Sequence, residues 1–263
     1  MNSSKSRFYL FLIIWAAQYA LAQVSEHHLS YSPVGKRVYN IEIHETAPLE
    51  SRDASKAYPI ILRTKQILTY KQMNHAIELN VATDPITWSE KRSRIDSLVH
   101  PYSILKEELL QQGTMTIDSL GNHQKRSSFL TPFCIPLPLK PVRLNETWEF
   151  NQSIRTRGVR ESEIVYQGHC ILYDIQKKAG QTIAVIVVNA STESQGKYKY
   201  KEFYNAEDLS FTALGTLTQI AYFNIDKGCM QELISEQIHT FDIQSANQSK
   251  SFNINSRLIC KLE

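Results

Sequence analysis

The chain has 263 residues, with 29 Lys and Arg against 26 Asp and Glu, so its formal net charge is +3. Nucleic-acid binding relies on concentrated positive charge, and this near-neutral balance argues against nucleic acid as the main partner. The length suffices for one large domain or two small ones.

The first 22 residues have the pattern of a secretory signal peptide. Lys5 and Arg7 precede the apolar run Phe8–Ala22, and Ala20-Leu21-Ala22 is a small-x-small cleavage site before Gln23. The run has 15 residues, whereas a helix that spans a bilayer needs about 20. We therefore predict cleavage at about Ala22-Gln23, and a soluble, exported mature chain, periplasmic or extracellular, without a transmembrane segment. Loss of Lys5 and Arg7 lowers the net charge to +1.

Strand patterns dominate the rest of the chain. In the first strand Tyr39, Ile41 and Ile43 point to one side, and the polar residues between them point to the other. The apolar run Ile183–Val188 is typical of a strand that is covered on both faces. Residues 230–241 have helical spacing but lie beside turn signals, and we assign them to a strand. Together with residues 230–241, the expected strands are 38–44, 60–70, 75–82, 147–154, 163–175, 182–190, 216–224 and 252–262.

Three segments carry helix signals. Residues 89–99 have a thin apolar side, and residues 102–112 lie between Pro101 and Gly113. Residues 206–214 follow a potential cap at Asn205 and precede Gly215. We therefore expect a mainly β protein, with an α+β class possible. Its antiparallel twisted sheet would form a half-barrel or a two-sheet sandwich, with two or three short helices.

Two parts of the sequence resemble each other. Gly113-Thr114-Met115-Thr116 matches Gly215-Thr216-Leu217-Thr218, and a turn glycine follows each, at Gly121 and Gly228. These pairs are offset by 102 and 107 residues. We hypothesise that residues 23–263 form a single compact β-rich unit of two similar halves, about 30–128 and 142–263. Chance similarity is the alternative.

A proline-rich segment, 131–141, joins the two halves. Its prolines enforce an extended chain, and its apolar composition predicts that it packs along the body. Residues 137–142 and Glu146-Thr147-Trp148 resemble the "LP-x-x-P-V … G-[DE]-T-W" stretch of uncharacterised exported β-rich proteins of Bacteroidota-type bacteria. Asn145 stands where Gly is usual, and Asn tolerates the left-handed conformation, so we expect the turn to persist. The resemblance implies a β-rich envelope protein and brings no functional residues.

The four cysteines, at 134, 170, 229 and 260, include no Cys-x-x-Cys pair, which disfavours a thioredoxin-type site or a zinc ribbon. Export permits disulfides, and four cysteines allow three pairings. If residues 229–241 and 252–262 form a hairpin, Cys229 and Cys260 lie near each other. A disulfide between them is therefore possible, and it would stabilise the fold by about 2–4 kcal/mol.

Known catalytic signatures are missing from the sequence, including Gly-x-Ser-x-Gly, His-Glu-x-x-His and a phosphate-binding glycine loop. The eight His are scattered. His169 and Cys170 are adjacent in a strand, so we predict Cys170 inward and His169 outward. We assign no catalytic, cofactor-binding or metal-binding residue. Paired carboxylates could serve a hydrolase, but no sequence spacing supports this role for the candidates Glu107, Glu108, Asp118 and Glu163.

Three functional hypotheses follow. The first is a non-enzymatic exported envelope protein that binds an apolar small molecule or another envelope protein, with helix 102–112 closing a curved sheet over a cavity. The second is a structural or assembly protein that acts through its surface. The third is a hydrolase whose site is built from distant strands.

Overall fold

The computed structural model describes residues 25–48, 57–74, 76–85, 87–88, 113–122, 135–156, 160–199, 208–244 and 249–263. All regular elements in these ranges are strands. They are β1 (Gly35–Pro48), β2 (Ala57–Gln72), β3 (Ile77–Thr83), β4 (Thr87–Trp88), β5 (Gly113–Ile117), β6 (Thr147–Thr156), β7 (Arg160–Lys178), β8 (Gln181–Lys199), β9 (Asp208–Asn224), β10 (Cys229–Gln244) and β11 (Ser249–Leu262).

The described strands form one antiparallel sheet, which is open. Its order is β5-β3-β2-β1-β11-β10-β9-β8-β7-β6, and β4 pairs with β2 off this path. The protein is therefore mainly β, and its described strands belong to one sheet instead of the two sheets of a sandwich. The pairing of β1 with β11 joins the early part of the chain to its last strand, and β5 and β6 lie at the two ends of the order.

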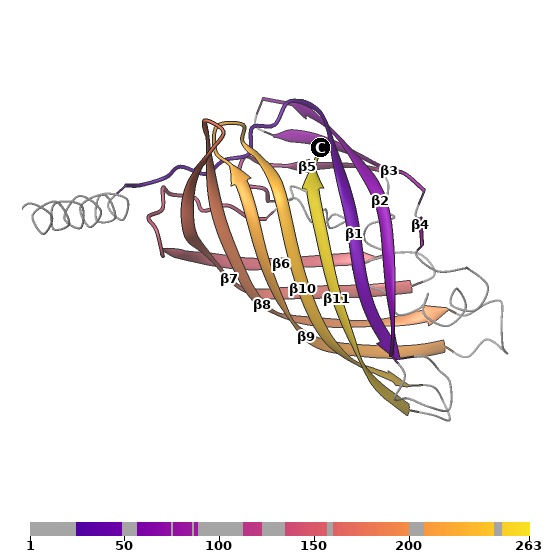
Figure 1. Cartoon of the computed structure of the whole chain (residues 1–263). Coiled ribbons are helices and arrows are strands. Elements are labelled where there is room, and N and C mark those ends of the chain that lie inside the picture. The colour runs from indigo at the N-terminus through magenta and orange to yellow at the C-terminus, as the bar shows by residue number, and fades with distance from the viewer. Residues whose placement is uncertain are drawn as a thin grey trace, which may run out of the picture.

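The sheet curls, so that β6 to β9 pass behind β1, β2, β10 and β11 (Figure 1). We call the face that carries Tyr39, Ile41 and Ile43 the inner face. All three side chains are buried, as the alternation in the sequence predicts. Ladder partners share a face, and the cross-strand neighbours of these residues, such as Cys260 and Leu258, belong to the same core.

The two ends of the sheet differ in their connections. At one end, tight turns at 179–180 and 225–228 join β7 to β8 and β9 to β10. We call this the turn end, and we call the opposite end, where β8 approaches residue 199 and β10 approaches residue 244, the loop end.

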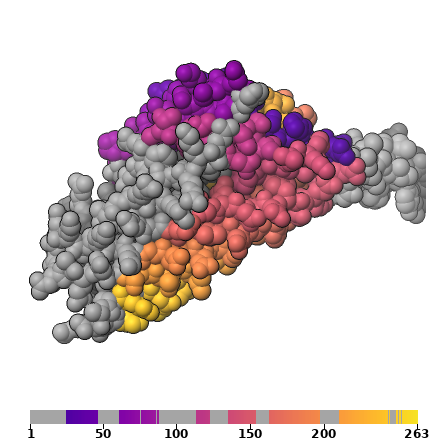
Figure 2. Space-filling view, turned by 180° about the vertical axis from the view of Figure 1, so that it is seen from behind, coloured from indigo at the N-terminus to yellow at the C-terminus, as the bar shows by residue number. Residues whose placement is uncertain are grey.

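Two extended segments cover the inner face at the turn end. Leu29, Tyr31, Ile135, Leu137 and Val142 are buried there. The backbone N–H of Leu137 donates to the carbonyl of Leu120 at 2.7 Å. Seen from behind, the magenta and pink residues of segments 113–122 and 135–156 lie between the purple strands and the orange strands (Figure 2). The described part of the proline-rich segment therefore packs along the body, as the sequence predicts.

The two turn glycines of the hypothesised repeat hold the same N-terminal segment. Gly121 has φ of 81° and Gly228 has φ of 54°, both in the left-handed region. The backbone N–H of Tyr31 donates to the Ser119 carbonyl at 2.6 Å, and that of Ser32 donates to the Gly228 carbonyl at 3.0 Å. Both turns therefore contact the same N-terminal segment, through Ser119 in one and Gly228 in the other, while the duplication itself stays a prediction.

The prediction of a helix at residues 206–214 is wrong, because strand β9 begins at Asp208. Phe211, Ala213 and Leu217 are buried while Thr212 and Leu214 are exposed, which is the period of a strand. Pairing with both β8 and β10 outweighs the local cap signals at Asn205 and Gly215. The helices expected at 89–99 and 102–112 lie outside the described residues.

The expected hairpin is confirmed, but the disulfide between Cys229 and Cys260 is not present. β10 pairs with β11 as predicted, yet Cys260 lies opposite Leu233, and Cys229 lies opposite Asn224 on β9. Cys229 is four residues from Leu233 along β10, a separation on the order of 10 Å, whereas a disulfide joins Cα atoms less than about 7 Å apart. Both are free buried thiols, and burial raises the pKa of each.

Candidate functional site

Buried polar side chains form a band across the inner face, between the core at the turn end and the loop end of the strands. Each is at most 8% exposed. We call this group the inner polar band; its members are Glu45, Thr192, Ser194, Gln219, Ser235, Gln237, His239 and Ser256. Polar groups are seldom buried without a structural or functional reason, and the band is therefore the candidate site.

The sheet ladder brings the band together from distant parts of the sequence. Glu45 on β1 pairs with Ser256 on β11, which in turn pairs with Gln237 on β10. Directly opposed side chains have Cβ atoms about 4.5–5.5 Å apart. These three residues therefore form one continuous row, which we call the Glu45 row, with a carboxyl group, a hydroxyl group and an amide.

A second contact crosses an entire strand. Thr192 on β8 and His239 on β10 both pair with Gly215 on the intervening β9. Thr192 Oγ1 and His239 Nε2 are nevertheless hydrogen bonded at 2.7 Å. A Cβ atom at Gly215 would lie 2.2 Å from the Ile238 carbonyl and 2.6 Å from His239 Cδ2. The absence of a side chain at Gly215 is therefore what lets the hydroxyl and the imidazole meet.

Two polar atoms in the band have no hydrogen-bond partner within the part of the chain that the structure describes. They are Ser194 Oγ and Gln237 Oε1, on side chains that are 1% and 3% exposed. By contrast, Gln219 Nε2 donates to Ser235 Oγ at 3.3 Å. A buried polar group without a partner destabilises a protein by about 1–3 kcal/mol. A bound molecule that supplied the missing partners would offset this.

Apolar side chains border the band on both sides. Toward the loop end, the rings of Phe211 and Phe241 have centroids 6.2 Å apart, and both are buried. Toward the turn end, Leu233, Ala221 and Cys260 continue the core. A surface of this kind, apolar with a few polar groups at fixed positions, is typical of small-molecule sites.

The two described carboxylates that were singled out in the sequence each bind partners close to them in the fold. Asp118 accepts bonds from the backbone N–H groups of Leu120 and Asn122 within its own turn, and Glu163 accepts a bond from Ser153 Oγ at 3.0 Å. Glu107 and Glu108 lie outside the described residues. Within the described ranges no three His, Cys, Asp or Glu side chains gather as metal ligands.

The neighbours His169 and Cys170 point to opposite faces, as predicted: His169 is exposed and Cys170 is buried. Burial strongly raises the pKa of the Cys170 thiol. A nucleophilic cysteine needs a lowered pKa and access to solvent, so the structure gives Cys170 the environment of a core residue.

Sequence reasoning missed the inner polar band. Its only signal is alternation: Ser235, Gln237 and His239 on β10, and Thr192 and Ser194 on β8, occupy every second position. A polar side of an antiparallel strand is normally assigned to solvent. Only the curled sheet shows that these polar sides face inward.

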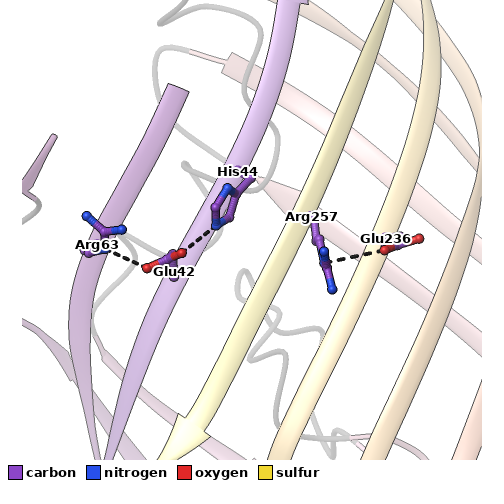
Figure 3. A network of polar contacts seen from close by, with 5 residues as sticks. All are labelled: Glu42, His44, Arg63, Glu236 and Arg257. Carbon is purple, nitrogen blue, oxygen red and sulfur yellow. Dashed lines mark hydrogen bonds and ion pairs between the residues drawn. The ribbon is translucent and has the colours of Figure 1, made fainter. Parts of the chain in front are cut away.

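The outer face carries exposed charges in an ordered network (Figure 3). Glu42 binds Arg63 Nε at 2.6 Å through Oε2 and His44 Nε2 at 2.5 Å through Oε1. Arg257 Nε lies 3.5 Å from Glu236 Oε1. The hydrogen bond from Arg63, followed by that from His44, lowers the pKa of the Glu42 carboxyl.

The outer face also carries an apolar row next to this network. Ladder pairing aligns one branched side chain from each of β7, β8, β9, β10 and β11, and each is partly exposed. We call this the outer apolar row; its members are Ile171, Val187, Ile220, Ile234 and Ile259.

No protein-family model matches the chain, and no curated protein shows significant similarity to it. Among the described residues, no helix has the length and apolar character that crossing a membrane requires.

Proposed function

We propose that this is a non-enzymatic, exported envelope protein that binds a ligand with an apolar body on the inner face of its curled sheet. In this view the sheet acts as a half-barrel, and the ligand lies along the inner polar band. The signal-peptide pattern of the first 22 residues supports export.

The observation that carries the proposal is the pair of buried atoms without hydrogen-bond partners, Ser194 Oγ and Gln237 Oε1. They lie on β8 and β10, on either side of the Thr192–His239 contact, and the nearby strands β9 and β10 carry Phe211 and Phe241. A protein selected for stability alone would fill these positions with apolar side chains, since burial of such side chains is favourable. A ligand that buries apolar surface and completes the hydrogen bonds explains both features.

The test is native mass spectrometry of the purified protein, followed by organic extraction and identification of any bound molecule. We expect an apolar or amphipathic molecule to co-purify, or the protein to bind added 1-monooleoylglycerol or methyl oleate at a ratio of one to one. A protein of unmodified mass that binds neither probe contradicts the proposal.

The outer apolar row favours a second candidate function, assembly through the surface. A row of this kind can pair with the same row of a second copy about a two-fold axis, which is the commonest symmetry of soluble oligomers. Sedimentation velocity tests this candidate with Ile220→Ser and Ile234→Ser as disrupting variants. A dimer that the variants dissociate supports assembly, and a monomer at all concentrations contradicts it.

A further inference from the structure

The turn end carries a local excess of positive charge. Five of its connecting segments together contain eight Lys and Arg and one acidic residue, Asp226. The whole chain, by contrast, has 29 basic and 26 acidic residues, so the basic residues are concentrated at this end. The five segments are 34–37, 71–74, 139–143, 177–180 and 225–228.

Acidic residues on the neighbouring connections are bonded within the protein. Glu26 Oε1 accepts a hydrogen bond from Arg143 Nη2 at 2.7 Å, and Glu146 Oε2 accepts one from the backbone N–H of Arg143 at 2.9 Å. Asp118 accepts from backbone N–H groups of its own turn. The lysines differ: among the described residues, none is hydrogen bonded or ion paired with Lys36, Lys140 or Lys178, which are all exposed. Their ammonium groups are therefore available to an anionic partner.

Exposed apolar side chains accompany these lysines. Val34, Met73 and Leu139 are 65%, 46% and 79% exposed, and each lies within two residues of a lysine in the sequence. Gly35 lies opposite Tyr70 in the pairing of β1 with β2, so Val34 and Met73 are at adjacent strand ends. The turn end thus presents apolar groups and positive charges together.

The tip at residues 139–140 is held by the backbone on which it stands. His27 and Val142 exchange two backbone hydrogen bonds, at 2.8 Å and 3.0 Å. Pro138 and Pro141, on either side of the tip, restrict the backbone further. Because the tip is ordered before any partner arrives, little conformational entropy is lost when it binds.

We propose that the turn end docks on an anionic lipid surface. The lysines bind the head-group phosphates, while Val34, Met73 and Leu139 enter the boundary between head groups and acyl chains. Peripheral membrane binding combines these two contributions, and it needs no spanning segment. A soluble polyanion would gain nothing from the three apolar side chains, whereas a lipid surface uses both features. The proposal goes beyond ligand binding on the inner face and does not depend on it.

The experiment is co-sedimentation of the purified protein with two kinds of vesicle. One contains dioleoyl phosphatidylcholine alone, and the other contains the same lipid with dioleoyl phosphatidylglycerol in a ratio of three to one. We expect binding to the anionic vesicles to be at least about tenfold stronger, because several lysines contact their surface. This preference should disappear in about 1 M NaCl, which screens the charges.

Matched variants locate the contact. Lys140→Gln should weaken binding to the anionic vesicles about fivefold, and Leu139→Ser should weaken it about tenfold. The control for the leucine is Leu214→Ser on β9, because Leu214 is 62% exposed. Arg257→Gln on β11 is the control for the lysine, since it removes the same charge from an exposed position of the outer face. Both controls should change binding less than about twofold.

Three outcomes would overturn the proposal. The first is no binding to the anionic vesicles, and the second is equal binding to both kinds of vesicle. The third is an equal loss in Leu139→Ser and Leu214→Ser, which would place the contact elsewhere on the surface. The comparison of the two vesicles uses the unaltered protein, so it gives its answer whether or not every variant folds.

Discussion

The inner face of one sheet is built in two ways at its two ends. At the turn end, Leu29, Tyr31 and Ile135 pack on the strands and leave an apolar core. Toward the loop end, the same long strands carry the inner polar band. The turn end thus buries mostly apolar surface, with few polar side chains such as Gln66 and Asn224, whereas the band consists of polar groups whose burial is unfavourable. The turn end therefore contributes mainly to stability, whereas the band is where we propose that a ligand binds.

The largest effect is expected at the turn end, from Tyr31→Ala. The Tyr31 ring meets the Phe223 ring edge-on at 5.3 Å, and its hydroxyl accepts from the Ile135 backbone N–H at 3.0 Å. Its removal should lower the free energy of unfolding by about 3–5 kcal/mol, as measured by urea denaturation. Tyr173→Ala is the control, because Tyr173 is 65% exposed. Equal effects of the two variants would refute a core at this end.

A smaller effect is expected from Gly215→Ala in the polar half. The new Cβ would lie 2.2 Å from the Ile238 carbonyl and 2.9 Å from Thr192 Oγ1. Overpacking should lower the free energy of unfolding by about 1–3 kcal/mol, measured in the same way. The variant should also separate the Thr192–His239 pair and weaken 1-monooleoylglycerol binding. A variant as stable as the unaltered protein would show that β9 passes less closely beneath the pair.

Two serine substitutions in the band should change the free energy of unfolding in opposite directions. Ser194→Ala removes a buried hydroxyl that has no partner in the described part of the chain, and should raise the free energy of unfolding of the ligand-free protein by about 1 kcal/mol. Ser235→Ala removes the acceptor of Gln219 Nε2 and should lower it by about 1 kcal/mol.

Ser191→Ala, at an exposed position of β8, is the control for both serine variants and should change stability by less than about 0.5 kcal/mol. If Ser194→Ala destabilises the ligand-free protein, the Ser194 hydroxyl is satisfied and the contrast between the two ends is weaker than we infer.

The smallest effect is expected on the outer face, from Glu42→Gln. Solvent screens the attraction between Glu42 and Arg63, because both side chains are partly exposed. The variant should therefore lower the free energy of unfolding by no more than about 0.5 kcal/mol at neutral pH. The folded state lowers the pKa of the Glu42 carboxyl. Its stabilising contribution is therefore present above the unfolded pKa of about 4.3 and is lost as the pH falls through the folded value.

The pH dependence is measured by thermal unfolding of both proteins between neutral pH and pH 3. The difference between the unaltered protein and Glu42→Gln should shrink as the pH falls. A difference that is constant with pH would contradict the ionic origin of the contact.

The strands could be predicted because alternation is a local property. Nearby residues alone predicted which side chains of β1 share a side, and they predicted the turn at Asn145. The structure confirms that turn, since Asn145 has a left-handed φ of 66°. The helix at 206–214 was wrong because the cap signals are local, whereas the pairing of β9 with two neighbours is not. The pairing of Cys229 with Cys260 was wrong because the register of the hairpin, with Gln244 opposite Ser249, places Cys260 opposite Leu233.

The sequence by itself determined a mainly β chain, most of its strand segments and its turn glycines. The tertiary structure decided the order of the strands, the curl of the sheet and the side of each strand that is buried. Alternation tells which residues share a side, but burial depends on what lies across from that side. For this reason the sequence carries no sign that Ser235, Gln237 and His239 are buried, and only the curled sheet places them inside.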